Sequence, residues 1–322
     1  MTAMPAMTSM TVAPESAVIL LCPGQGAQAP GMGKAWAQRS TSARRTFDEA
    51  DAALGFPLSK LCFEGPAEEL NRTDLAQAAL YTTSVASWRG LVEAGVYQPE
   101  QVIAAAGLSL GEFTALHLAG ALSFEDGLRL VRLRGQAMQQ AAEASAGGMV
   151  ALIRGDDASA AALCKAVLDQ LPGEVLVPAN YNAPGQVVVS GTRAACELAL
   201  RLAEGHGMAA KALAVAGAFH SPLMAPAAER LREALDRATW AKPRTPVLAN
   251  VTAQPHAADD LASIRARLVE QLTQPVRWAQ SMAWSLANLK GRYVELAPNN
   301  VLAGLMKRID RKTPVLNHAE PA

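Results

Sequence analysis

The chain has 322 residues, 50% of them hydrophobic and 18% charged, which is enough to bury a large core in one domain or in two smaller ones. Lys plus Arg and Asp plus Glu number 29 each, and the resulting formal charge of zero argues against a nucleic-acid-binding protein. The four scattered cysteines lack the spacing of a zinc site, so we predict no metal and free thiols in a reducing, cytoplasmic compartment.

Residues 1–16 lack basic side chains, and we interpret them as a flexible tail. The apolar run over 17–22 is too short for a membrane span or a signal-peptide core, so it predicts a buried strand and no membrane association. Residues 24–29 follow it and read G-x-G-x-x-A, which is one form of the dinucleotide-binding fingerprint.

A dinucleotide site also requires a second strand that ends in an acidic residue about 20 positions further on. The acidic residues at this distance are Asp48 and Glu49, but both lie in a predicted helix over 34–54. An NAD(P)-binding oxidoreductase is therefore the weakest alternative for the function, and the glycines of this loop need another explanation.

The rest of the chain alternates strands and helices. Outside its middle third, the pattern predicts helices over 66–97, 124–144 and 261–272 and strands over 101–106 and 292–296. Residues 149–215 read strand, helix, two hairpin strands, helix, strand, which is the ferredoxin-like order. We therefore predict an α/β protein in which a ferredoxin-like subdomain, 148–215, is inserted into a larger α/β subdomain, 17–147 and 216–322.

The segment Gly107–Gly111 reads G-x-S-x-G and lies between a predicted strand and a predicted helix. That context is typical of a nucleophile elbow, a sharp turn that raises the hydroxyl of Ser109 above the sheet. The backbone N–H of Leu110 would then lie at a helix start, where the helix dipole favours an oxyanion. The alternative is a turn of small residues without chemistry.

A nucleophilic serine needs a base, and the chain contains five histidines. Four of them are poorly placed, because they lie in a terminal tail, in a polar loop, at a helix end and two turns into the helix after the elbow: His318, His256, His206 and His117. His220 follows a predicted strand, where catalytic loops of α/β sheets lie, so it is the candidate base by elimination.

Arg134 falls on the apolar side of the helix predicted over 124–144. A charged side chain among apolar ones needs a partner. That partner could be a structural carboxylate, or it could be the carboxylate of a substrate, which a guanidinium binds in a bidentate manner. The helical pattern leaves both alternatives open.

An ordered set of motifs covers about residues 17–310: CPGQGAQAPGMG, GLSLGEFTAL, VRLRGQAMQ, NYNAPGQVVVSG, AFHSPLM, EQLTQPVRW and VLAGLMKRI. The set resembles the malonyl-CoA:acyl carrier protein transacylase family, which includes the acyltransferases of polyketide synthases. The resemblance implies an α/β-hydrolase-like core with a ferredoxin-like insert. The chain departs from the family at Leu108, where many members carry histidine. It also departs over Ala297–Asn300, near the last predicted strand, where it reads A-P-N-N and the family usually has G-P-G.

The resemblance also implies a role for each site residue. These roles are the nucleophile Ser109, the base His220, the malonyl clamp Arg134, the oxyanion-binding N–H groups of Gln25 and Leu110, the carbonyl of Gln271 that orients the histidine, and a malonyl-selecting Phe219. The expected reaction is ping-pong transfer of malonyl from malonyl-CoA to the phosphopantetheine thiol of acyl carrier protein, without a cofactor and by a monomer. The resemblance leaves fatty acid and polyketide synthesis equally open, and a thioester hydrolase of the same fold is the alternative.

Overall fold

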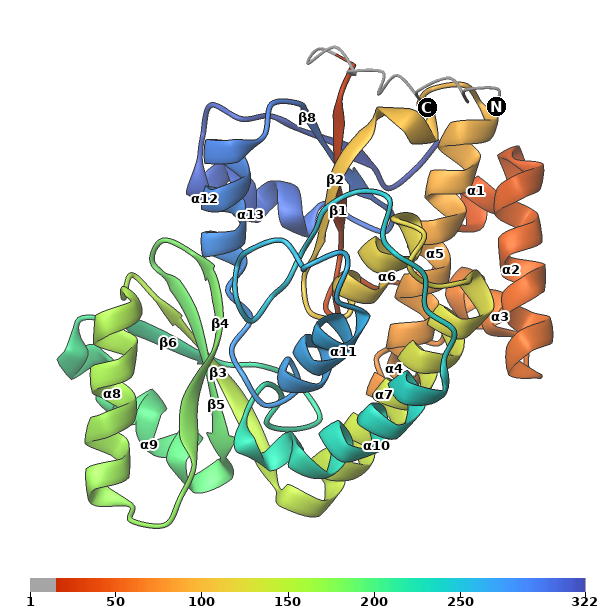
Figure 1. The fold of residues 1–322 in the computed structure, drawn as a ribbon. Helices are drawn as coiled ribbons and strands as arrows, with labels where there is room; N and C mark the ends of the chain where they lie inside the picture. The colour runs from red at the N-terminus through yellow and green to blue at the C-terminus, as the bar shows by residue number, and fades with distance from the viewer. Residues whose placement is uncertain (1–15, 322) are drawn as a thin grey trace, which may run out of the picture.

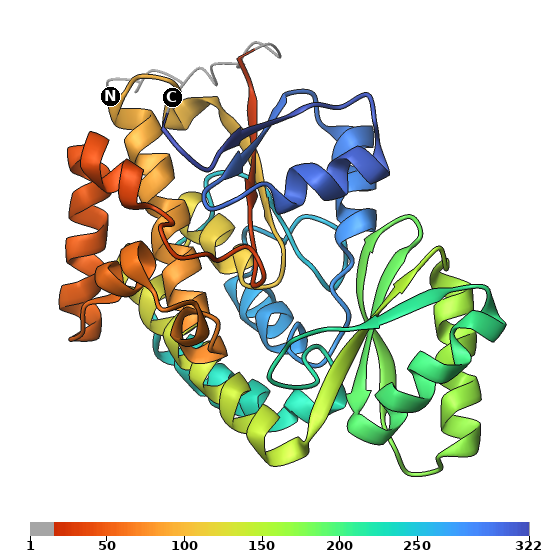
Figure 2. The ribbon, with the colours of Figure 1, turned by 180° about the vertical axis from the view of Figure 1, so that it is seen from behind.

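The computed structural model describes residues 16–321, so the predicted tail lies outside the described residues except for Ser16. The larger of its two sheets has five parallel strands in the order β7-β2-β1-β8-β9. Figure 1 labels its central strands β2, β1 and β8, and Figure 2 shows the molecule from behind. The strands span Val18–Cys22 (β1), Val102–Gly107 (β2), Val247–Leu248 (β7), Arg292–Leu296 (β8) and Val315–His318 (β9).

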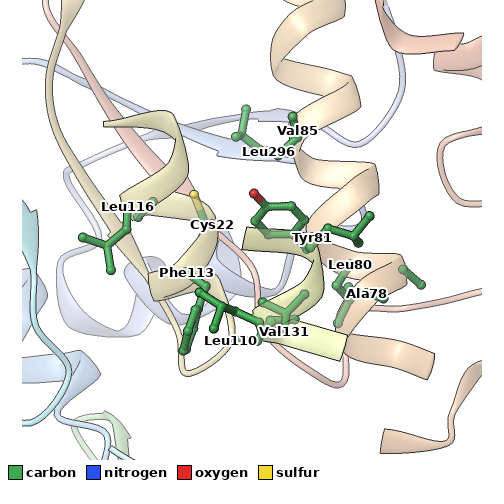
Figure 3. Close-up of a cluster of buried hydrophobic side chains, with 14 of the residues drawn as sticks. Cys22, Ala78, Leu80, Tyr81, Val85, Leu110, Phe113, Leu116, Val131 and Leu296 are labelled. Carbon is green, nitrogen blue, oxygen red and sulfur yellow. The ribbon is translucent and has the colours of Figure 1, made fainter. Parts of the chain in front are cut away.

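The central strand β1 is buried on both faces, which explains its continuous apolar sequence. Successive side chains of a strand point to opposite faces. Accordingly, Cys22 packs against one layer of helices, and Ile19 packs against another. The first layer contains α5 (Thr73–Glu93), α6 (Gly111–Leu118) and α7 (Phe124–Ser145), and the second contains α12 (Trp278–Asn288) and α13 (Val301–Ile309). Figure 3 shows part of the first layer, where Cys22, Tyr81, Phe113 and Val131 belong to one cluster of buried side chains.

The smaller sheet has four antiparallel strands in the order β4-β5-β3-β6, which is the ferredoxin-like arrangement. Its strands are β3 (Gly147–Ile153), β4 (Leu176–Ala183), β5 (Gln186–Thr192) and β6 (Ala209–Ala212). One face packs against α8 (Asp157–Gln170) and α9 (Arg193–Leu202), as Figure 1 shows. The predicted α/β class with a ferredoxin-like insert is confirmed, while the subdomain limits at 148 and 215 stay a prediction.

Several element boundaries differ from the prediction. The helix expected over 34–54 is two helices, α1 (Lys34–Arg39) and α2 (Thr41–Leu54), because Ser40 is extended and caps α2 by accepting a hydrogen bond from Ala43 N. The turn after α7 is made by Ala146, at φ 42°, and the two glycines that follow, Gly147 and Gly148, begin β3. His318 lies in β9 and not in a tail.

The remaining helices surround these two sheets. They are α3 (Leu58–Glu64), α4 (Ala67–Leu70), α10 (Ala225–Arg237) and α11 (Leu261–Glu270). The helix predicted over 66–97 is therefore two helices, α4 and α5, and the helix predicted over 261–272 is α11. Within residues 16–321, no helix combines the length and the apolar character that a membrane span needs.

Candidate active site

The predicted elbow is present between β2 and α6. Ser109 has a φ of 52°, a left-handed conformation that costs a non-glycine residue on the order of 1–3 kcal/mol. Its flanking glycines are required by close packing: a Cβ on Gly107 would lie 1.8 Å from the carbonyl carbon of Gly111, and one on Gly111 would lie 2.0 Å from Cys22 O. The two glycines therefore let β1, β2 and α6 meet tightly enough to hold the serine in this conformation.

His220 faces Ser109 directly. Its Nε2 lies 2.9 Å from Ser109 Oγ, and its Nδ1 lies 2.6 Å from the backbone oxygen of Gln271. A carbonyl oxygen only accepts hydrogen bonds, so Nδ1 carries the proton and Nε2 is the free acceptor toward the serine. Burial, and then the nearby cation of Arg134, lower the pKa of His220 to about 4. The imidazole is therefore neutral at pH 7, as a base must be.

Arg134 is 1% exposed and reaches the same hydroxyl. Its Nη2 lies 3.0 Å from Ser109 Oγ and 2.9 Å from Gln271 Oε1, and its Nη1 lies 2.7 Å from Gln77 Oε1. Its Nε is buried and has no hydrogen-bond partner among residues 16–321. Burial lowers the pKa of this guanidinium to about 10, against the opposing effect of Glu112. In the part of the chain that the structure describes, no carboxylate forms a direct ion pair with Arg134.

The other predicted site residues line one cleft of about 490 Å³ beside Ser109. Gln25 and Leu110 lie on its wall, and among residues 16–321 neither backbone N–H donates a hydrogen bond. Phe219 lies beside His220 and is 6% exposed. The opposite wall comes from the face of the small sheet that α8 and α9 leave uncovered, through Met149 and Val188.

The glycine-rich loop after β1 contributes to this cleft and does not form a dinucleotide fold. A Cβ on Gly24 would lie 2.3 Å from the backbone oxygen of Leu108, so glycine is needed for the loop to pass over the elbow. Asp48 and Glu49 lie inside α2, and the described chain between β1 and β2 contains helices and loops only. The structure therefore contradicts the dinucleotide-binding interpretation of this loop, on which the oxidoreductase alternative rested.

The loop at Ala297–Asn300 leads into α13, whose Val301 and Leu305 line the cleft. Asn299 has a φ of 69°, the left-handed region that suits glycine. Asparagine tolerates this conformation better than other side chains, which explains why the loop keeps its turn without the usual glycine.

Sequence reasoning missed a buried polar layer behind the elbow. Asn250 Oδ1 accepts a hydrogen bond from Ser109 N at 2.7 Å, and its Nδ2 donates to Gly107 O at 2.7 Å. His256, expected in a polar loop, is buried and lies 2.7 Å from Glu112. Glu112 could have been singled out from the sequence, because it is a charged residue in the apolar helix GEFTALHL. Arg134 was singled out for the same reason, since it lies on an apolar helix face.

The family profile described as "Acyl transferase domain" matches residues 19–317 of this chain. Malonyl CoA-acyl carrier protein transacylase of Bacillus subtilis (strain 168) is 43% identical over 309 residues, which cover 95% of this chain and 94% of that protein. This chain belongs to the malonyl-CoA:acyl carrier protein transacylase family. The transacylase of Escherichia coli (strain K12) is 41% identical over 288 residues, covering 89% of this chain and 91% of that protein.

Solved structures of the transacylase family have the same fold. The transacylase from Xanthomonas oryzae superposes with a TM-score of 0.89 at 41% identity, over 95% of this chain and 96% of that one. The malonyl-transacylase solved in complex with a type II polyketide synthase acyl-carrier protein superposes with a TM-score of 0.88 at 37% identity, over 95% and 96% of the two chains.

Proposed function

We propose that this chain transfers the malonyl group of malonyl-CoA to the phosphopantetheine thiol of acyl carrier protein, through an ester on Ser109. The observation that carries the proposal is the buried guanidinium of Arg134, which forms no direct ion pair with a carboxylate among the described residues and lies 3.0 Å from the hydroxyl of Ser109. A buried cation beside a nucleophile fits a substrate that brings its own carboxylate. Relatives named malonyl CoA-acyl carrier protein transacylase support the same substrate and acceptor.

The first half of the reaction makes the acyl-enzyme. Nε2 of His220 takes the proton of Ser109 as Oγ attacks the thioester carbon of malonyl-CoA. The carbonyl oxygen becomes an oxyanion and accepts hydrogen bonds from the N–H groups of Gln25 and Leu110; one such donor is typically worth about 10²–10³ in rate. The C–S bond then breaks, and the CoA sulfur leaves with the proton that His220 returns.

The second half transfers malonyl to the carrier protein. The phosphopantetheine thiol enters the cleft, and the neutral imidazole of His220 takes its proton. The sulfur attacks the ester carbon, the same two N–H groups hold the second oxyanion, and the ester C–O bond breaks as His220 protonates Ser109. Because the Gln271 carbonyl holds Nδ1–H throughout, Nε2 alternates between base and acid without a change of tautomer.

Arg134 selects the acyl group by binding the malonyl carboxylate. Its Nη1 and Nη2 already donate to the amide oxygens of Gln77 and Gln271, which hold the guanidinium in position without neutralising it. The carboxylate of a bound malonyl group would be an anion in direct contact with the guanidinium. We also propose that the ring of Phe219 crowds a substituent on the malonyl α-carbon.

Intact-mass measurement tests this function. Mixing the protein with malonyl-CoA should add one malonyl group, Ser109→Ala should abolish the adduct, and phosphopantetheinylated acyl carrier protein should remove it and gain the malonyl mass. An undiminished adduct on the alanine variant would contradict the assignment of the nucleophile. An adduct that decays within seconds without carrier protein would favour the thioester hydrolase.

The cellular setting is part of the same proposal. Among the described residues all four cysteines are buried and free, which supports a reducing, cytoplasmic location. We propose a monomer that acts on carrier proteins of fatty acid or polyketide synthesis. Assays with carrier proteins of both kinds would distinguish these pathways.

A further inference from the structure

A buried carboxylate lies directly behind the elbow. Glu112 is the second residue of α6 and is 1% exposed. Its Oε2 accepts hydrogen bonds from Gln271 Nε2 at 2.7 Å and from Asn250 N at 3.0 Å, and its Oε1 lies 2.7 Å from His256 Nε2. It does not line the cleft, so it cannot touch a substrate there. A buried carboxylate needs a reason, since removing its charge from water is costly.

We propose that Glu112 is a positioning residue: it balances the charge of Arg134 through the side-chain amide of Gln271 and thereby keeps the guanidinium free to bind the substrate carboxylate. This inference rests on the proposed malonyl transfer. The inference adds to the proposed function, because it assigns the preference for an anionic acyl group partly to a residue outside the cleft.

The amide of Gln271 transmits the effect because its two ends differ. Its Nε2 donates to Glu112 Oε2 and, at 3.0 Å, to Ser109 O. Its Oε1 must then face the other way, where Arg134 Nη2 donates to it at 2.9 Å. A reversed amide would place its donor nitrogen against the guanidinium and its oxygen against a carboxylate, which is unfavourable at both ends. The carboxylate of Glu112 therefore sets which end of Gln271 meets Arg134.

The amide spacer also explains why Arg134 remains available. A carboxylate in direct contact would occupy the guanidinium, as in an ordinary buried ion pair. Here one anion and one cation lie in the same buried region with a neutral amide between them, so the anion stabilises the cation without covering it. The same Gln271 holds His220 through its backbone oxygen, so one residue links the clamp, the base and Glu112.

The competing explanation is that Glu112 serves only to anchor His256 and the segment around Asn250. Glu112→Gln separates the two roles. The glutamine has the same shape, its oxygen can accept from Gln271 and Asn250, and its nitrogen can donate to His256, whose Nε2 accepts in the other tautomer. Hydrogen bonding is thus preserved while the charge is removed. The matched control is His256→Gln, which changes the anchor and keeps the carboxylate.

The experiment measures the rate of adduct formation on Ser109 from malonyl-CoA and from acetyl-CoA over a range of concentrations. For Glu112→Gln we expect malonyl kcat/KM to fall roughly 10- to 100-fold, mostly through KM, as is typical when an outer partner of a binding group is lost. Acetyl transfer should stay within about threefold, and His256→Gln should keep the malonyl-to-acetyl ratio of the natural protein.

If Glu112→Gln leaves the malonyl-to-acetyl ratio of kcat/KM unchanged, whether both values fall equally or neither falls, the inference is overturned. If this variant fails to fold, Glu112→Asp provides the second measurement: it keeps the charge, so it should keep the malonyl-to-acetyl ratio even if the melting temperature falls, and a lost ratio would contradict the charge role. Failure of the proposed function itself would look different, because the natural protein would then form no malonyl adduct at all.

Discussion

The guanidinium Nη2 of Arg134 lies 3.0 Å from the hydroxyl oxygen of Ser109, on the same oxygen that His220 approaches to 2.9 Å. One hydroxyl thus meets a cation and a neutral base in a buried site. The cation disfavours protonation of the imidazole, which is one of the two causes that lower the pKa of His220. Arg134, which we propose to bind the substrate carboxylate, therefore also keeps the imidazole of His220 neutral and able to accept a proton.

Removing the clamp should change the acyl preference. We expect Arg134→Ala to lower malonyl kcat/KM by about 10²- to 10³-fold, because a buried bidentate charge pair is lost, while acetyl transfer is retained. Arg129→Ala is the matched control, since Arg129 is on the same helix but pairs with Glu125 at the surface. Steady-state kinetics with both acyl-CoA substrates measure the effect. Parallel losses for malonyl and acetyl would contradict the clamp.

The pH profile should report the environment of His220. The ordinary pKa of histidine is 6.5, and burial and Arg134 lower it to about 4, so kcat/KM for acetyl-CoA should stay level from pH 7 down to about pH 5 and fall near pH 4. Arg134→Ala removes the nearby cation, so the acid limb should move to higher pH but stay below 6.5, because burial remains. An acid limb that does not move in this variant would contradict the electrostatic coupling.

The ring of Phe219 should control substitution on the malonyl unit. Replacing it by serine opens space beside His220, so Phe219→Ser should raise the methylmalonyl-to-malonyl ratio of kcat/KM. One methyl group in an apolar pocket is worth about 1–3 kcal/mol, which corresponds to roughly 10- to 200-fold. Competition between the two CoA esters, read by the mass of the adduct on Ser109, measures the ratio directly. No change would show that another side chain sets this preference.

The elbow glycine should be far less replaceable than a glycine elsewhere. A Cβ on Gly107 would lie 1.8 Å from backbone, so Gly107→Ala should destabilise the fold by about 3 kcal/mol or more. Gly304, on the exposed side of α13, has open space around its Cβ position, and Gly304→Ala should stabilise the fold by about 0.5–1 kcal/mol. Urea denaturation of both variants measures the difference. Equal free energies of unfolding would refute the packing argument.

The sequence pattern was sufficient to predict the features that depend only on residues close together in the chain. The continuous apolar run of β1 predicts a strand buried on both faces, and the G-x-S-x-G between strand and helix predicts the strained turn at Ser109. The order of elements between 149 and 215 predicts the ferredoxin-like sheet, because a chain has few ways to pair four strands in that order. The missed break at Ser40 is also local, since an extended serine that caps a helix competes with continuation of that helix.

The chemistry of the site required contacts between distant segments. The sequence placed Arg134 on an apolar face but left its partner open, and only the structure shows that the partners are the amides of Gln77 and Gln271. It also matched the loop at Gly24 to a nucleotide pattern, whereas packing sets that loop over Leu108. Glycine spacing and helical faces follow from local geometry, so the sequence by itself determined them. Which buried charge meets which amide depends on how separate helices and loops pack, so the tertiary structure alone decided it.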